Sequence, residues 1–178
     1  MSKTLTLIES VMKHEGWRSK AYKCTAGVWT IGYGFAIRSL TDDEIKIWAK
    51  HLGTSKDALK GSIKVAKDTG EYAHFHMDKE TGAEILEHKL ENIKIEMCKK
   101  LEWAGWVSTV LQNAMIEWIY QLGINGVLKF TKTLGFIEKG MYMNAIEEVK
   151  KSAWYKQTPK RVETLISALK YELEQWEY

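Results

Sequence analysis

Only one proline, Pro159, occurs among the 178 residues of the chain, so the sequence has no proline-rich linker or extended stalk. Apolar residues make up 45% of the chain and charged residues 28%, which is ample for a folded core at this length. We therefore do not expect intrinsic disorder. We expect one domain, or two small lobes that share a core, built mostly from helices.

The charge and cysteine content narrow the class of protein. Lys and Arg number 26 against 23 Asp and Glu, a net charge of +3 that favours anionic partners without choosing among nucleic acid, lipid headgroups and acidic wall polymers. The two cysteines, Cys24 and Cys98, are too few for a disulfide-stabilised secreted scaffold, so we expect synthesis in a reducing compartment. The apolar run at residues 5–8 is too short for a signal peptide, and the longest uncharged run, residues 103–116, is too short to cross a bilayer. We expect no membrane insertion.

The first helix and a small sheet can be placed from apolar spacing and glycines. Gly16 is suited to end a helix whose apolar stripe is formed by Leu5, Ile8, Val11 and Met12, which puts Glu15 at the C-terminus of that helix. Between residues 17 and 34, short runs of aromatic, threonine and β-branched residues alternate with glycines. This pattern predicts a small β-sheet with tight turns, and no other segment predicts a sheet convincingly.

Helical patterns dominate the next part of the chain. Thr41 to Glu44 forms a capping box, Gly53 ends that helix, and a weaker helix is predicted over residues 55–67. Residues 71–77 are ambiguous. Asp78 can cap a long helix whose apolar stripe consists of Leu86, Leu90, Ile93, Met97 and Leu101. Such a helix is long enough to connect two lobes.

The last third of the chain is also predicted to be helical. A broad apolar face indicates a central, well-buried helix that Gly123 ends; it comprises Val110, Leu111, Ala114, Met115, Trp118, Ile119 and Leu122. Shorter helices should follow, separated by Asn125-Gly126 and by Gly140. Thr158 and Pro159 should begin the final helix.

A resemblance to a known family rests on three segments. HEGWRSKAYKCTAGVWTIGYGF resembles the catalytic segment of glycoside hydrolase family 24, the phage-type lysozymes or endolysins. Their signature is Glu, eight residues, usually Asp, five residues, Thr, and here Glu15, Cys24 and Thr30 have that spacing. QLGINGVLKFTKTL and KSAWYKQTPKR resemble the T-even phage lysozyme subgroup. The sequence departs from the family pattern at Cys24, at Phe35, where the family commonly has His, and over residues 36–77, which look longer than in the smaller members.

The resemblance implies a mainly α (α+β) fold with two lobes and a cleft between them. The N-terminal lobe would cover about residues 15–80 and contain the sheet, and a connecting helix would cover about residues 79–101. A helical C-terminal lobe of about residues 103–178 would be joined by the first helix. The whole chain would form a single lysozyme domain.

The chemistry of the three signature residues can be argued from their side chains. Cleavage of a glycosidic bond needs an acid that protonates the leaving oxygen and usually a second group that activates water or stabilises positive charge. Glu15 is the predicted acid, and the hydroxyl of Thr30 can hold the attacking water. Cys24 could act as a thiolate base or nucleophile, or as a neutral thiol that helps to hold water, and we favour the base.

Further site residues follow from the resemblance alone. It places Ala36, Tyr120 and Thr133 along the sugar cleft, although each could equally serve in packing. It also places Arg161 close to Glu15, with Gln121 as a second supporting residue.

Three other features are interpreted as structural. His74 and His76 would point the same way on a strand, but no carboxylate or cysteine signature accompanies them, so we predict no metal site. Cys98 is interpreted as apolar packing. The eight Trp and eight Tyr could stack on bases, but most lie on apolar helix stripes, so we interpret them as core and predict no nucleic-acid partner.

The predicted function is an endolysin-type muramidase that hydrolyses the β-1,4 bond between N-acetylmuramic acid and N-acetylglucosamine in bacterial peptidoglycan, without a metal or organic cofactor. The resemblance implies a monomer made in the host cytoplasm and released late in infection by a separate holin to act on the cell wall in the periplasm. Two alternatives remain. The same site could act as a lytic transglycosylase, or the protein could bind peptidoglycan without cutting it.

Overall fold

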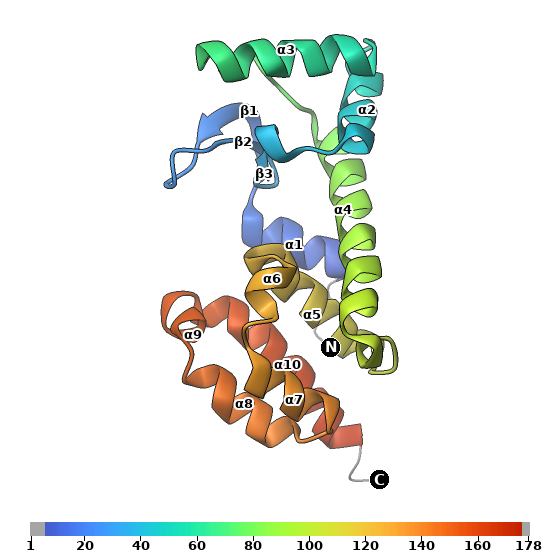
Figure 1. Ribbon diagram of the computed structural model, residues 1–178, viewed down its shortest axis with the longest axis vertical. Helices are drawn as coiled ribbons and strands as arrows, with labels where there is room; N and C mark the ends of the chain where they lie inside the picture. Colours follow the sequence, from blue (N-terminus) through green and yellow to red (C-terminus); the bar gives the residue numbers. More distant parts are fainter. Residues whose placement is uncertain (1–5, 176–178) are drawn as a thin grey trace. The chain divides into compact units, whose positions relative to one another are not determined.

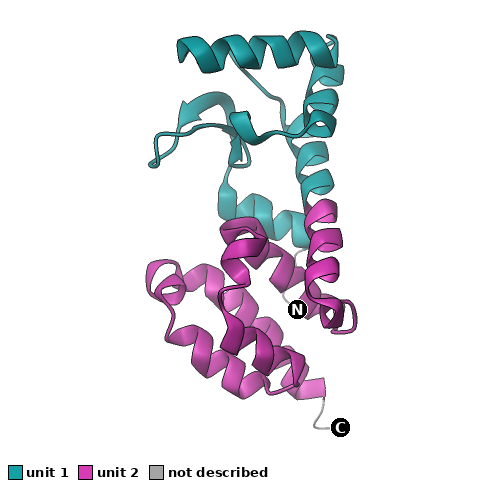
Figure 2. Ribbon diagram, viewed as in Figure 1, with its two compact units in different colours: residues 1–89 teal, residues 90–178 magenta. Residues whose placement is uncertain are grey.

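The computed structural model describes residues 6–175 (Figure 1). Helices predominate and one small antiparallel sheet lies near the N-terminus, so the predicted mainly α (α+β) fold class is confirmed. The chain divides into two compact units, Met1–Lys89 and Leu90–Tyr178, and the boundary falls within the longest helix, α4 (Lys79–Lys100) (Figure 2). The lobe boundaries expected from the sequence stay a prediction.

The first helix of unit 1, α1 (Leu7–Glu15), begins and ends as its sequence dictates. Thr6 caps its N-terminus in a capping box with Glu9, and Gly16, at a φ of 69°, closes its C-terminus through an N–H that donates to the Met12 carbonyl. Glu15 is therefore the last helical residue, as predicted. Leu5, assigned to the apolar stripe of this helix, lies outside the described residues.

The sheet consists of β1 (Arg18–Lys23), β2 (Trp29–Gly32) and β3 (Phe35–Ala36), in that order and antiparallel. Thr30 lies opposite Tyr22 on one side and opposite Ala36 on the other. The sheet predicted for residues 17–34 is confirmed and continues to Ala36. The paired strands place Thr30 on the central strand, where it is almost completely buried.

The remainder of unit 1 contains the short 3-10 helix η1 (Ile37–Ser39) and the helices α2 (Asp42–His51) and α3 (Lys56–Thr69). The capping box of α2 forms as predicted, and α3 extends two residues beyond the predicted end, to Gly70 in the left-handed conformation. The ambiguous residues 71–77 contain one isolated bridge, between His76 and Lys20. This segment is held in place because the indole of Trp48 donates to the His76 carbonyl at 3.0 Å.

One buried ion pair and one hydrogen bond hold α2 against α4. The Glu44 carboxylate is 2% exposed, and Lys89 Nζ lies 2.8 Å from each of its oxygens. At the other end of α2, His51 Nε2 lies 2.8 Å from Glu84 Oε2, and this hydrogen bond holds the pKa of Glu84 below its usual value. Asp78 caps α4 as predicted, since its Oδ1 accepts from the Thr81 N–H at 2.7 Å.

Unit 2 is built around α5 (Thr109–Leu122), which follows the 3-10 helix η2 (Glu102–Gly105). Most of the predicted apolar face of α5 is buried, and Gly123 ends the helix as predicted. The prediction was wrong for Val110, which is 40% exposed. Val110 is the second residue of α5, and the buried residues of this helix begin only at the next position, Leu111.

Five shorter or terminal helices complete unit 2: α6 (Ile124–Val127), α7 (Thr131–Glu138), α8 (Tyr142–Lys150), α9 (Ala153–Gln157) and α10 (Pro159–Gln175). The prediction that Asn125-Gly126 separates helices was wrong, because both residues lie inside α6. A single helical turn uses the same right-handed backbone as the common β-turn, so turn residues fit it. Gly140 does separate α7 from α8, and Pro159 is the first residue of α10.

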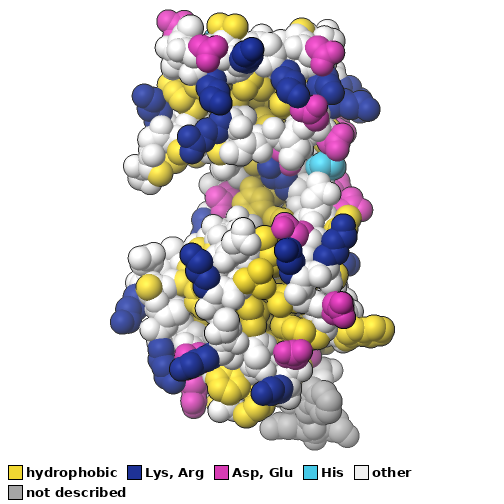
Figure 3. Space-filling model, in the orientation of Figure 1, with side chains coloured by type: hydrophobic (Ala, Val, Ile, Leu, Met, Phe, Trp, Pro, Cys, Tyr) yellow, Lys and Arg dark blue, Asp and Glu magenta, His cyan; other side chains and the backbone are white. Residues whose placement is uncertain are grey.

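None of the helices in residues 6–175 is long and apolar enough to cross a membrane. Lys and Arg side chains alternate with Asp and Glu on the visible face of both units (Figure 3).

We predict that Lys89→Ala lowers the free energy of unfolding by about 2 kcal/mol or more, because it leaves the Glu44 carboxylate buried without its cation. Lys50→Ala is the matched control: Lys50 Nζ lies 4.0 Å from Glu84, and both side chains are largely exposed, so the expected loss is below about 0.5 kcal/mol. Urea unfolding of the parent and of each variant measures both losses. Equal losses in the two variants would contradict the importance of the buried pair.

Candidate active site

Glu15 is positioned by the end of α1 and by a glycine in the turn between two strands of the sheet. Gly34, in the turn between β2 and β3, has a φ of 83°, and a methyl group placed on it would come within 2.9 Å of Glu15 Oε2. The carboxylate thus lies directly against the backbone of this turn, in space that a side chain at residue 34 would occupy. Glu15 itself is half-buried.

Cys24 and Thr30 are joined through one carbonyl group. The Val28 carbonyl accepts a hydrogen bond from the Cys24 N–H at 2.9 Å and another from the Thr30 hydroxyl at 3.0 Å. The Gly27 N–H donates to the Cys24 carbonyl at 2.8 Å, which closes a tight turn between β1 and β2. This turn brings the second and third signature residues together, with Thr30 buried and Cys24 half-exposed.

The surroundings of Cys24 favour its ionised form. Hydrogen bonds from the backbone of Val28, which has the largest effect, and of Ala26 hold the pKa of the Cys24 thiol below its usual value. Burial raises this pKa by a smaller amount, and a hydrogen bond from the Thr30 hydroxyl lowers it further. Thr30 has one hydroxyl proton, so it can donate either to the Val28 carbonyl or to the thiolate. The hydroxyl can therefore turn toward Cys24 when that residue ionises.

Ala36 lies beside Thr30 in unit 1. The two residues are directly paired across β2 and β3, and Ala36 is half-buried. Its small side chain keeps the strand next to Thr30 uncrowded. The structure thus gathers Glu15, Cys24, Thr30 and Ala36 on α1 and the sheet of unit 1.

Gln121 and Thr133 belong to unit 2. Gln121 links two elements, because its Oε1 accepts from the Trp154 indole at 2.9 Å and its Nε2 donates to Thr158 Oγ1 at 3.3 Å. Thr133 is 2% exposed but lines a hollow of about 340 Å³ at the start of α7, bordered by Lys129, Lys132 and other residues. Gln121 therefore has a clear packing role.

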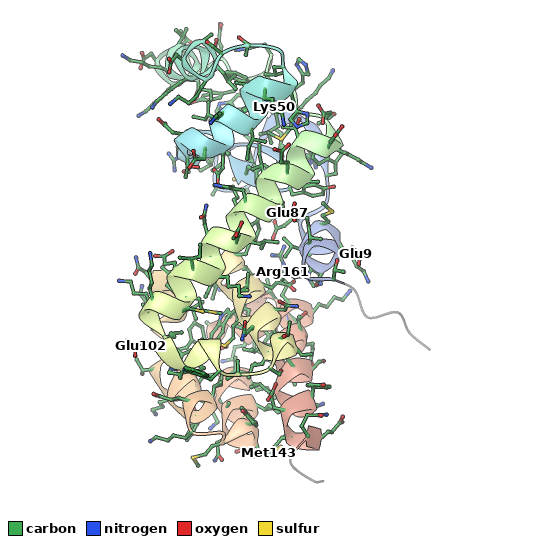
Figure 4. The ribbon with its side chains drawn as sticks, turned by 90° about the vertical axis from the view of Figure 1, so that its right-hand side faces the viewer. Glu9, Lys50, Glu87, Glu102, Met143 and Arg161 are labelled. Atoms are coloured by element: carbon green, nitrogen blue, oxygen red, sulfur yellow. The ribbon has the colours of Figure 1, made fainter. Side chains whose placement is uncertain are left out.

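Tyr120 and Arg161 are also in unit 2. Tyr120 is half-buried near the end of α5. Arg161 lies in the first turn of α10, where it is labelled in Figure 4, and is half-buried.

The remaining sequence candidates have local contacts. His74 packs on Phe75 with ring centres 4.2 Å apart, and His76 forms the bridge to Lys20. Cys98 is half-buried. Within residues 6–175, no three His, Cys, Asp or Glu side chains are grouped so that they could hold a metal ion.

Sequence reasoning missed two contributors to this site. Gly34 was recognised only as a turn residue, although it sets the approach of the Glu15 carboxylate. The backbone of Ala26 and Val28 acts on Cys24 irrespective of side-chain identity, so no residue type could signal it. The short, glycine-containing spacing between Cys24 and Thr30 was the available clue to a tight turn.

We predict that Gly34→Ala destabilises the protein more than Gly27→Ala. Both glycines have a positive φ, which costs an alanine about 1 kcal/mol or more, but a methyl group on Gly27 meets nothing within 4 Å whereas one on Gly34 meets Glu15. Urea unfolding of the two variants measures the difference. Equal destabilisation would show that the carboxylate does not depend on the missing side chain.

Comparison with known proteins identifies relatives over most of the chain. The chain is 29% identical to Probable T4-type lysozyme 2 of Dictyostelium discoideum over 171 residues, which cover 90% of this chain and 91% of that protein. It is 26% identical to Probable T4-type lysozyme 1 of the same organism, over 91% of this chain and 92% of that protein. It is also 27% identical to the pre-baseplate central spike protein of Enterobacteria phage T4, over 88% of this chain but 26% of that protein.

A family model described as phage lysozyme matches residues 12–172, a range that contains every candidate site residue. Because this match covers most of the chain, the chain belongs to the phage lysozyme family and is a lysozyme-type peptidoglycan hydrolase.

Proposed function

We propose that the protein is a muramidase that hydrolyses the β-1,4 bond between N-acetylmuramic acid and N-acetylglucosamine. One observation carries the proposal: in unit 1, the Glu15 carboxylate lies against Gly34, two residues beyond the strand on which Thr30 is linked to Cys24. A carboxyl group that can donate a proton and a pair of groups that can handle water are the two requirements for glycoside hydrolysis.

In the proposed reaction, Glu15 donates its proton to the glycosidic oxygen. The bond from C1 of N-acetylmuramic acid to that oxygen breaks, and the electron pair stays with the leaving N-acetylglucosamine. Thr30 holds the water whose oxygen bonds to C1, and the Cys24 thiolate takes the proton that this water loses. The products are two free sugar ends, and proton exchange with solvent restores Glu15 and Cys24. Family resemblance implies inversion at C1.

The lowered pKa of Cys24 supports the base role over a thiol that only holds water. The use of Cys24 as the base nevertheless limits the rate of hydrolysis. A carboxyl acid ordinarily loses its proton well below the pH at which a thiol loses its own, so the form with a protonated acid and an ionised thiol is a minor one. Any lowering of the thiol pKa enlarges that active fraction.

The substrate-binding residues are proposed as the resemblance assigns them. Ala36 borders Thr30, and the hollow around Thr133 is bordered by Lys129, Lys132 and Lys151, which suit the carboxylates of the wall. Tyr120 is assigned to the sugars. Gln121 and Arg161 are proposed as supporting residues, and for Gln121 the two hydrogen bonds to Trp154 and Thr158 support that role.

Two other activities are possible for such a site. In a lytic transglycosylase the 6-hydroxyl of the substrate attacks C1, so no water is needed. The linkage of Thr30 to Cys24 favours hydrolysis because it provides two groups for an attacking water. A protein that binds the wall without cutting it would not need a carboxylate fixed against Gly34.

The proposed biological role is that of an endolysin. The protein would be made in the host cytoplasm, act as a monomer, and reach the wall in the periplasm when a separate holin opens the membrane. This part of the proposal rests on membership of the phage lysozyme family.

We predict that Glu15→Gln lowers the rate of wall clearance by about 10² to 10⁴, the usual contribution of general acid catalysis, while the protein stays folded. The clearing of permeabilised bacteria, followed by turbidity, measures the rate. Clearance near the parent rate would exclude Glu15 as the acid.

The products of the parent enzyme provide the companion measurement. Hydrolysis leaves a reducing N-acetylmuramic acid, whereas transglycosylation leaves a 1,6-anhydro ring. Detection of the anhydro product would show that the enzyme is a transglycosylase and not a hydrolase. If neither product forms, the protein binds the wall without cutting it.

We predict that the activity of the parent stays level with pH up to the Cys24 pKa and falls above it, because below that pKa each gain in ionised thiol is matched by a loss of protonated acid. In Cys24→Ser, which has no thiolate, activity should already fall at lower pH, as the carboxyl acid ionises. In Cys24→Asp the two carboxyl groups lose their protons in the same range, so activity should peak at about pH 4. Initial rates of wall clearance across the pH range measure all three. Superimposable profiles for the parent and Cys24→Ser would show that Cys24 only holds water.

A further inference from the structure

A groove in unit 1 lies outside the candidate active site. It has a volume of about 480 Å³ and runs between η1, α2 and α3, in the segment whose sequence departs from the family pattern. Its floor is apolar and consists of Ile37, Leu40, Ile45, Ile63 and Tyr72. Figure 3 shows apolar side chains beneath α3 with Lys and Arg side chains around them. A volume of this size suits a small molecule or a short peptide segment.

The charges on the rim of this α2–α3 groove divide into two groups. Asp42 is engaged, because Lys60 Nζ lies 2.6 Å and Lys56 Nζ 3.3 Å from its oxygens. By contrast, the side chains of Arg38, Lys64 and Lys67 line the groove and take part in no hydrogen bond or ion pair within residues 6–175. Asp57 is likewise unengaged within the same range. The groove therefore offers three cationic groups and one carboxylate to a ligand.

The wall of the groove on α3 contains a glycine. Gly61 lies in the interior of the helix, where glycine costs about 0.5–1 kcal/mol relative to alanine. No crowding requires it, since a methyl group on Gly61 would meet nothing within 4 Å. The missing side chain instead leaves open space along the part of the groove that Gly61 lines.

We propose that the α2–α3 groove binds a stem peptide of peptidoglycan, the short peptide that branches from N-acetylmuramic acid. Such a peptide carries alanine methyl groups, two or more carboxylates and one amine. The methyl groups match the apolar floor, the carboxylates match Arg38, Lys64 and Lys67, and the amine matches Asp57. An aliphatic anion such as a fatty acid has no group for Asp57, so the mixed charge of the rim favours the peptide. This inference rests on the proposed function, because it presumes that the chain meets peptidoglycan.

The binding test uses the tetrapeptide N-acetyl-L-alanyl-γ-D-glutamyl-meso-diaminopimelyl-D-alanine, whose blocked N-terminus leaves the single free amine of the wall-bound peptide, and isothermal titration of the full chain. The parent should bind saturably. Lys64→Glu should weaken binding by about tenfold or more, since it removes one charge-assisted contact and adds a repulsive charge. Gly61→Trp should weaken it as strongly by filling the groove.

Matched controls separate the groove from general effects. Lys46→Glu makes the same charge change on an exposed part of α2, and Val65→Trp places the same ring on α3 at a residue that is 61% exposed and outside the groove. Both should bind like the parent. Thermal unfolding checks every variant, and Lys64→Glu tests the proposal even where Gly61→Trp does not fold.

Activity distinguishes failure of this inference from failure of the proposed function. The groove variants should hydrolyse peptide-free glycan strands at the parent rate and intact wall more slowly. Unchanged tetrapeptide binding in both groove variants, or saturable binding of laurate but not of tetrapeptide, would overturn the inference and leave the muramidase proposal intact. A parent that cuts no glycan but binds the tetrapeptide in the groove would overturn the function alone.

Discussion

The Val28 carbonyl accepts hydrogen bonds from the Cys24 N–H and from the Thr30 hydroxyl, and the candidate active site depends on this shared acceptor. It fixes the turn that follows β1 and orients the side chain at the centre of the sheet. The same turn presents backbone groups to the Cys24 sulfur, which explains why the thiol is easier to ionise than an ordinary one. One peptide unit thus links the shape of the site to its electrostatics.

Much of the architecture follows from local sequence signals. The capping boxes at Thr6 and Thr41, the stop at Gly16 and the proline at the start of α10 are decided within a few residues of each helix end. For this reason the position of Glu15 at the end of α1 could be predicted from the sequence. The spacing of Glu15, Cys24 and Thr30 could indicate a candidate site because the family signature is itself local.

Other features depend on tertiary packing and were not predictable in this way. The two-residue signal Asn125-Gly126 does not reveal whether the turn it favours will be extended into a single-turn helix. The burial of the Glu44 carboxylate depends on the charge of Lys89. The two residues are far apart in the sequence, and no sequence pattern indicates that they pair. The close approach of Gly34 to Glu15 likewise joins a sheet turn to a helix end, and only the folded backbone shows it.

Cysteine at the position where the family usually has aspartate also has a consequence for redox chemistry. The thiolate is the form that oxidants attack, and the backbone around Cys24 increases its share at any given pH while leaving the residue half-exposed. The backbone groups that lower the pKa of the Cys24 thiol therefore also make it susceptible to oxidation, first to the sulfenic acid. A carboxylate at this position does not undergo that oxidation, so the cysteine ties the chemical state of residue 24 to the redox conditions around the protein.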